Sequence, residues 1–120
     1  MRILGFSVDW PKLDKPEYTT FRFPRKDYDR GRDWHIAEEV QIVVHPRSHD
    51  SRIRKGNAQI VSKINMTISQ ISEHEAREDG FDNLSDMLAW LEKSHGNVPL
   101  KPEHPINKLT FRWTMRYDGK

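Results

Sequence analysis

The strongest constraint on the fold is a capped helical segment in the second half of the chain. Ser72 precedes Glu75 by three residues, the spacing of a capping box, and Gly80 follows as a stop signal. A second helix is expected over residues 84–96, because its apolar residues recur at helical spacing. These apolar positions are Leu84, Met87, Leu88 and Leu91. Two short helices therefore belong side by side in one α-helical unit.

Strands are predicted before and after this helical unit. In residues 108–115, Leu109, Phe111, Trp113 and Met115 alternate with polar residues, which is the period of a half-buried strand. Four further strands are expected over residues 3–8, 18–23, 40–44 and 57–66, with polar loops over 9–16, 25–35 and 45–55. The pattern predicts one α+β domain over residues 1–120, a small β-barrel of five or six strands with two helices packed on it.

The order of three short motifs resembles a known family. The strand Tyr18-Thr19-Thr20-Phe21-Arg22 carries a Thr-x-Arg segment, the first helix ends in Glu78-Asp79-Gly80-Phe81, and the last strand carries Leu109-Thr110-Phe111. Over residues 15–115 this order is similar to that of the ASCH domain, a member of the PUA-like superfamily. The resemblance implies a cleft between the Thr-x-Arg strand and the helix bearing Glu78, where nucleic acid or a modified nucleoside is bound.

Strand parity indicates which side chains face that cleft. Tyr18, Thr20 and Arg22 lie on one face, and the phenylalanines between and after them lie on the other. Glu78 stands in the last turn of its helix, where a negative charge benefits from a cationic partner. The resemblance makes Arg22 that partner, so an Arg22–Glu78 pair beside Thr20 is predicted.

An enzymatic alternative follows from the same resemblance. One branch of the family removes the acyl group from 4-acetylcytidine with a Lys, a Thr and a Glu, and the Lys stands three residues before the Thr. Thr20 and Glu78 match two of these positions, but Glu17 occupies the third, so Lys15 would have to replace that lysine. Ribonuclease activity is associated with other members of the family.

Charge is distributed unevenly along the chain. Residues 22–63 hold ten Lys or Arg against six Asp or Glu, whereas residues 69–93 hold two against seven. A basic surface of this kind is typical of polyanion binders, although charge runs are also ordinary solvated faces. Tyr18 and Trp34 are the predicted stacking aromatics. The predicted basic nucleic-acid contacts are Arg22 in the cleft and, as phosphate contacts, Arg25, Lys26, Arg30, Arg47, Arg52, Arg54 and Lys55.

Composition narrows the function classes further. The chain has no cysteine, which excludes disulfides, zinc–thiolate sites and a thiol nucleophile. No apolar run has the length of a membrane span, and Asp9 follows the first apolar residues too soon for a signal peptide. We therefore expect a stand-alone cytoplasmic monomer without metal or cofactor that binds RNA, another single-stranded nucleic acid or a modified nucleoside.

Overall fold

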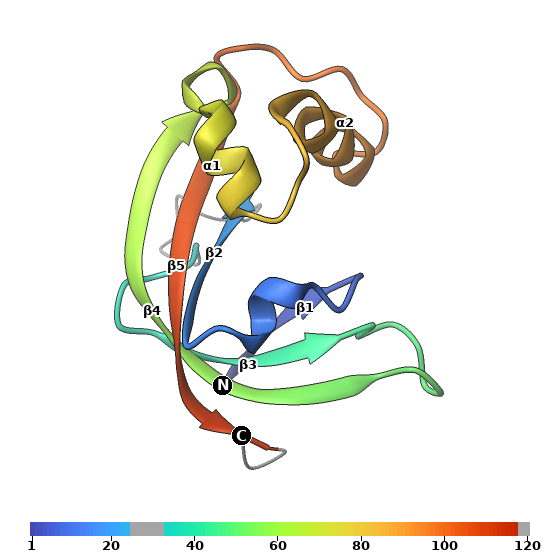
Figure 1. Ribbon diagram of the computed structural model, residues 1–120, viewed down its shortest axis with the longest axis vertical. Helices are drawn as coiled ribbons and strands as arrows, with labels where there is room; N and C mark the ends of the chain where they lie inside the picture. Colours follow the sequence, from blue (N-terminus) through green and yellow to red (C-terminus); the bar gives the residue numbers. More distant parts are fainter. Residues whose placement is uncertain (25–32, 118–120) are drawn as a thin grey trace.

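The structure, a computed structural model, describes residues 1–24 and 33–117. Within these ranges the chain forms a five-stranded sheet with two α-helices gathered at one end (Figure 1). The strands are β1 (Arg2–Phe6), β2 (Glu17–Arg22), β3 (Glu39–Val44), β4 (Ile53–Thr67) and β5 (Pro105–Arg116). The α-helices are α1 (Glu73–Glu78) and α2 (Leu84–Ser94), and the short 3₁₀ helices are η1 (Pro11–Asp14) and η3 (Ile68–Gln70).

The sheet has the strand order β1-β3-β4-β5-β2. Strands β1 and β3 run parallel, and the other neighbours are antiparallel. The pairing of β4 with β5 extends from Gly56 opposite Arg116 to Thr67 opposite Pro105. Gly56 has φ +145°, and a Cβ there would lie 2.1 Å from the carbonyl oxygen of Met115, so only glycine permits this close approach.

The sheet that the described strands form is not closed, whereas a barrel was predicted. The pairings between the described strands leave β1 and β2 at the two ends of the sheet, which is therefore open. The predicted composition of five strands and two α-helices is present. Several boundaries differ from the predicted ones. Residues 9–16 contain η1, β5 begins at Pro105, and β4 begins at Ile53, so Arg54 and Lys55 lie in a strand rather than in a loop. Arg54 pairs with Val43 of β3, although its polar side chain carries no strand signal.

The predicted capping box of the first helix is confirmed, and a side-chain cap also starts the second helix. The backbone N–H of Glu75 donates to Ser72 Oγ at 3.1 Å, and the Ser72 N–H donates to Glu75 Oε1 at 3.0 Å. At the start of α2, the N–H of Asp86 donates to the side-chain oxygen of Asn83 at 2.8 Å. Local hydrogen bonds of this kind depend only on sequence neighbours, which is why the sequence pattern located both helix starts.

Two separate hydrophobic clusters hold the fold together. The sheet core lies over β1, β3, β4 and β5 and includes Leu4, Ile42, Ile60 and Phe111. The helix core joins α1 and α2 to β2 and β5 and includes Phe21, Met87, Leu91 and Ile106. Functional side chains can therefore be placed where the two cores meet. Among the described residues, no helix is both long enough and apolar enough to cross a membrane.

Candidate functional site

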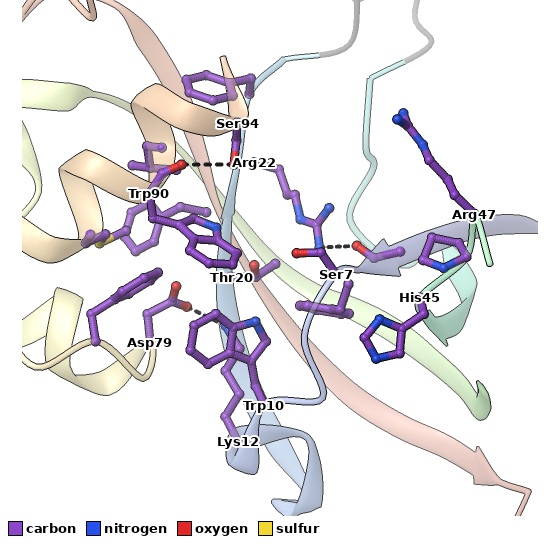
Figure 2. A pocket seen from close by; sticks show the side chains of 18 of the residues that line it. Ser7, Trp10, Lys12, Thr20, Arg22, His45, Arg47, Asp79, Trp90 and Ser94 are labelled. Atoms are coloured by element: carbon purple, nitrogen blue, oxygen red, sulfur yellow. Dashed lines mark hydrogen bonds and ion pairs between the residues drawn. The ribbon is translucent and has the colours of Figure 1, made fainter. Parts of the chain in front are cut away.

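A cavity of about 820 Å³ receives side chains from both ends of the molecule (Figure 2). Its walls come from the end of β1, the segment before and within η1, β2, the turn after β3, and the α1–α2 region. Ligand pockets in proteins commonly have volumes of about 300–1,000 Å³. The cavity is thus large enough for a ligand of nucleotide size.

A buried ion pair lies in the cavity wall. Lys12 Nζ lies 2.9 Å from Asp79 Oδ1, and each side chain is only 5% exposed. Pro11 opens η1, which directs Lys12 inward, and Asp79 is the C-terminal cap residue of α1. The hydroxyl of Thr19 donates to the same carboxylate oxygen at 3.4 Å. The pair joins η1 to the helical end of the molecule.

Burial moves the pKa values of both partners toward their neutral forms. Desolvation lowers the pKa of Lys12, and attraction to Asp79 offsets part of this effect. Desolvation likewise raises the pKa of Asp79, against the opposing attraction of Lys12 and Arg22. Buried groups with shifted pKa values are common in binding and catalytic sites, because their proton affinities respond to a bound ligand.

Arg22 brings a second cation to the cavity. Its Nη2 donates to the carbonyl oxygen of Gly5 at 2.7 Å, and its guanidinium lies 4.7 Å from the centre of the Phe6 ring. Burial lowers the pKa of Arg22 to about 10, and the charge of Asp79 opposes this shift. Within residues 1–24 and 33–117, Arg22 has no carboxylate at ion-pair distance. The side chain therefore holds β2 against β1 and still carries a charge without a paired anion in the described chain.

Three aromatic side chains form one wall of the cavity. The ring of Trp10 lies 5.3 Å from that of Phe81 and 5.5 Å from that of Trp90, between centroids. Gly80 stands beside the Trp10 ring, and its φ of +109° is a backbone conformation that favours glycine. Trp10 and Trp90 come from segments 80 residues apart, so the wall depends on tertiary structure.

The opposite side of the cavity is polar and basic. His45, Arg47 and Ser48, which follow β3, line it. Figure 2 shows His45 and Arg47 on one side, the two tryptophans on the other, and Arg22 between them. The cavity thus has an aromatic end and a cationic end.

The structure brings some of the predicted cleft residues together and separates others. Thr20 and Arg22 line the cavity, together with Phe21 and Phe23, which have the opposite strand parity. Tyr18 is 4% exposed and packs in the sheet core, with its ring stacked at 5.5 Å from Phe111. Tyr18 lies opposite Phe111 in the strand register, so the aromatic pair draws it away from the cavity.

The predicted pairing of Arg22 with Glu78 is not present. Glu78 is exposed and lies 3.3 Å from His74 on the outer side of α1. The adjacent Asp79 faces the cavity instead, because successive residues of a helix end point in directions about 100° apart. Acidic residues stand at both positions, and the sequence alone did not distinguish the inward one.

The lysine of the site also differs from the predicted one. Lys15 is exposed, and Glu17 lies 3.1 Å from Arg112 on the surface. Lys12 enters the cavity through η1, a 3₁₀ helix in a segment expected to be a loop. The dipeptide Pro11-Lys12 was the available signal, since proline is favoured at the first position of a helix.

The structure describes some of the predicted basic nucleic-acid contacts. Arg25, Lys26 and Arg30 lie outside the described residues. Arg47 lines the cavity, Arg52 and Arg54 are exposed, and Lys55 Nζ lies 3.3 Å from Asp9.

Trp34, a predicted stacking aromatic, is 4% exposed in the sheet core, with the guanidinium of Arg2 4.5 Å from its ring centre. Trp10 and Trp90 provide accessible aromatic rings at the cavity instead. In the part of the chain that the structure describes, no group of three or more His, Asp or Glu residues is arranged to hold a metal ion.

Comparison with known proteins adds evidence on the fold. No family model and no curated protein matches this sequence. Among solved structures, the chain resembles protein EF3133 from Enterococcus faecalis V583, described as DUF984, with a TM-score of 0.62 and 10% sequence identity. The similarity covers 88% of this chain and 65% of that chain. At this identity the similarity establishes a shared fold, and the chain spans about 65% of the length of the solved protein.

Proposed function

We propose that this protein binds a nucleobase in the cavity, either the base of a free nucleotide or an unstacked base of single-stranded RNA. The observation that carries the proposal is the combination of Trp10 and Trp90 with Lys12 and Arg22 in one cavity. Aromatic side chains stack on bases, and cations balance the phosphate groups. A cavity with both features suits a nucleotide unit better than it suits a purely apolar ligand.

Polar side chains in the same cavity supply contacts for a base edge. Thr20, Asp79 and Ser94 line it and offer hydroxyl or carboxylate oxygens. Base recognition in single strands relies on stacking together with hydrogen bonds to exposed edges. These residues would select among bases, whereas the tryptophans would supply affinity for any base.

We propose an ASCH-like, PUA-like architecture as the finer description of this fold, with the open sheet curved toward a barrel. The motif order in the sequence and the shared fold with the DUF984 protein support it. Contacts between the end strands also support it, since Arg22 of β2 donates to the Gly5 carbonyl of β1. A side-chain contact of this kind would bring the two ends of the sheet together.

Titration of the intrinsic tryptophan fluorescence tests the proposal. Cytidine 5′-monophosphate, adenosine 5′-monophosphate and short single-stranded RNA are the probes, and binding is expected to quench Trp10 and Trp90. Trp90→Ala should weaken binding about tenfold or more, because stacking contributes about 1–3 kcal/mol per base. Trp113→Phe, a change beside the sheet core, serves as the matched control and should change affinity less than twofold. Failure of every probe to bind would refute the proposal.

Salt dependence tests whether RNA also contacts the surface outside the cavity. Arg52 and Arg54 are exposed and stand before and within the start of β4. Replacing both by Ala should reduce the slope of log affinity against log salt, because each phosphate contact adds about 0.7 to that slope for single strands. An unchanged slope would remove these two residues from the RNA-binding surface.

Hydrolysis of an acylated nucleoside is the second candidate function. The specific observation is the Lys12–Asp79 pair, which lies in the cavity with Thr20 and resembles the Lys, Thr and Glu of the ASCH-family amidohydrolases. It ranks second because the carboxylate accepts its hydrogen bond from Thr19 rather than from Thr20. We expect little acetate release from 4-acetylcytidine. Efficient release that is lost in Lys12→Met and retained in Lys15→Ala would place hydrolysis first.

A further inference from the structure

We propose that the cavity selects an anionic ligand and binds it in one orientation, with the base against Trp10 and Trp90 and a phosphate group against Arg22 and Arg47. The preferred ligand class is therefore the nucleoside phosphate rather than the neutral nucleoside. This inference rests on the proposed function and specifies the ligand of the same cavity.

The balance of charge in the cavity supports an anionic ligand. Among the described residues that line it, Lys12, Arg22 and Arg47 are cationic and Asp79 is anionic. The lining residues thus have an excess of two positive charges when histidine is neutral. Arg22 is partly buried and Arg47 is exposed, so an anion bound between them would offset this excess.

The ion pair indicates which cation remains for the ligand. Lys12 already contacts Asp79 at 2.9 Å, so its charge is largely balanced within the protein. Arg22 donates from Nη2 to a neutral carbonyl oxygen, that of Gly5. A guanidinium has five N–H donors and is suited to bidentate binding of phosphate oxygens. Arg22 is therefore the central anion-binding group.

The arrangement of the walls sets the orientation. Asp79 lies at the aromatic end, and its pairing with Lys12 beside Trp10 leaves little net charge there to attract a phosphate. Arg47 lies at the far end with His45, and Arg22 lies between the ends (Figure 2). A ligand that carries an aromatic group and an anionic group can therefore contact both ends in only one orientation.

Paired ligands that differ by one phosphate test this inference. Cytidine is compared with cytidine 5′-monophosphate, and adenosine with adenosine 5′-monophosphate, by isothermal titration calorimetry on the full chain. We expect each monophosphate to bind at least about tenfold more tightly than its nucleoside, because hydrogen bonds from a guanidinium to a phosphate are charge-assisted. Arg47→Gln should reduce this ratio severalfold, and Arg52→Gln, an exposed arginine outside the cavity lining, should leave it unchanged.

Variants of Arg22 test the central contact. Arg22→Lys keeps the charge but loses the bidentate geometry, so it should reduce the phosphate preference while nucleoside affinity stays within about twofold. If Arg22→Lys does not fold, Arg47→Gln still tests the inference. Equal affinity of nucleoside and monophosphate, with tryptophan quenching by both, would overturn the anionic preference and leave base binding intact. Absence of binding by either ligand would refute the proposed function as well.

Discussion

Two ion pairs connect α1 to the rest of the molecule, and they differ mainly in burial. Asp79 at the end of α1 lies 2.9 Å from Lys12 in the cavity, with 5% of each side chain exposed. Glu75 in the first turn of α1 lies 2.8 Å from Lys108 of β5, with 18% of each side chain exposed. The two contacts are almost equal in length, so their environments account for any difference in their effects.

The carboxylates of the two pairs have opposite pKa shifts. Burial raises the pKa of Asp79 in spite of Lys12 and Arg22. Burial also acts to raise the pKa of Glu75, but hydrogen bonds from Lys108 and Ser72 outweigh it, and the net shift is downward. The outer pair therefore stabilises the fold, whereas the cavity pair keeps charges in a place that disfavours them. Such a cost is typical of groups placed for binding or chemistry.

Removing one charge from the cavity pair should have the largest effect on stability. Asp79→Asn leaves Lys12 buried without its carboxylate and should lower the free energy of unfolding by about 3–5 kcal/mol. Urea denaturation followed by circular dichroism measures the change. Glu78→Gln is the matched control, because Glu78 is exposed one residue away, and should change stability by less than about 0.5 kcal/mol. A loss below 1 kcal/mol in Asp79→Asn would show that the pair is not isolated from solvent.

A backbone substitution beside the cavity pair should have an intermediate effect. Gly80 has φ +109°, a conformation that residues with a Cβ rarely adopt, and its neighbour is the Trp10 ring. Gly80→Ala should lower the free energy of unfolding by about 1–3 kcal/mol through backbone strain. Tryptophan fluorescence monitors the substitution, because the added Cβ would contact the Trp10 ring at 3.4 Å. Gly96→Ala tests the same backbone strain at a glycine with φ +76°, where no described residue beyond its chain neighbours lies within 4 Å of the added Cβ. The tryptophan fluorescence of this variant should stay unchanged.

Removing the charge of the outer pair should have a smaller effect. Glu75→Gln removes the ion pair with Lys108 but keeps an amide that can still accept the Ser72 N–H in the capping box. The free energy of unfolding should fall by about 1 kcal/mol. Thermal and urea unfolding both measure this loss. A loss as large as that in Asp79→Asn would remove the distinction between the two pairs.

The stability lost in Glu75→Gln and the stability lost in Asp79→Asn should depend on pH in opposite directions. Because the pKa of Glu75 is lowered in the folded state, its ionised carboxylate stabilises the fold at pH values above the usual pKa of 4.5. This stability is lost as the pH falls through the folded-state pKa. The raised pKa of Asp79 has the opposite effect on stability. Protonation of Asp79 favours the folded state as the pH falls toward 3.8, the usual pKa of this side chain. On acidification, the stability gap between wild type and Glu75→Gln should narrow, and the gap to Asp79→Asn should widen. Gaps that change in the same direction would contradict the assigned shifts.

Features that depend on near neighbours in the chain could be predicted from the sequence. The capping box of Ser72 and Glu75 and the alternation in β5 involve groups only a few residues apart, and both are present. These patterns are readable because helix and strand periods convert short sequence spacing directly into direction.

The composition of the cavity was decided by the tertiary structure. Lys12 meets Asp79 across 67 residues, and Trp10 meets Trp90 across 80, so no local period relates them. A 3₁₀ turn at Pro11 and the end of α1 determine that Lys12 and Asp79 point inward, rather than Lys15 and Glu78. Side-chain direction at the end of a helix changes by about 100° per residue. An error of one residue in the sequence reading therefore exchanges a buried carboxylate for an exposed one, and only packing between the two cores selects between them.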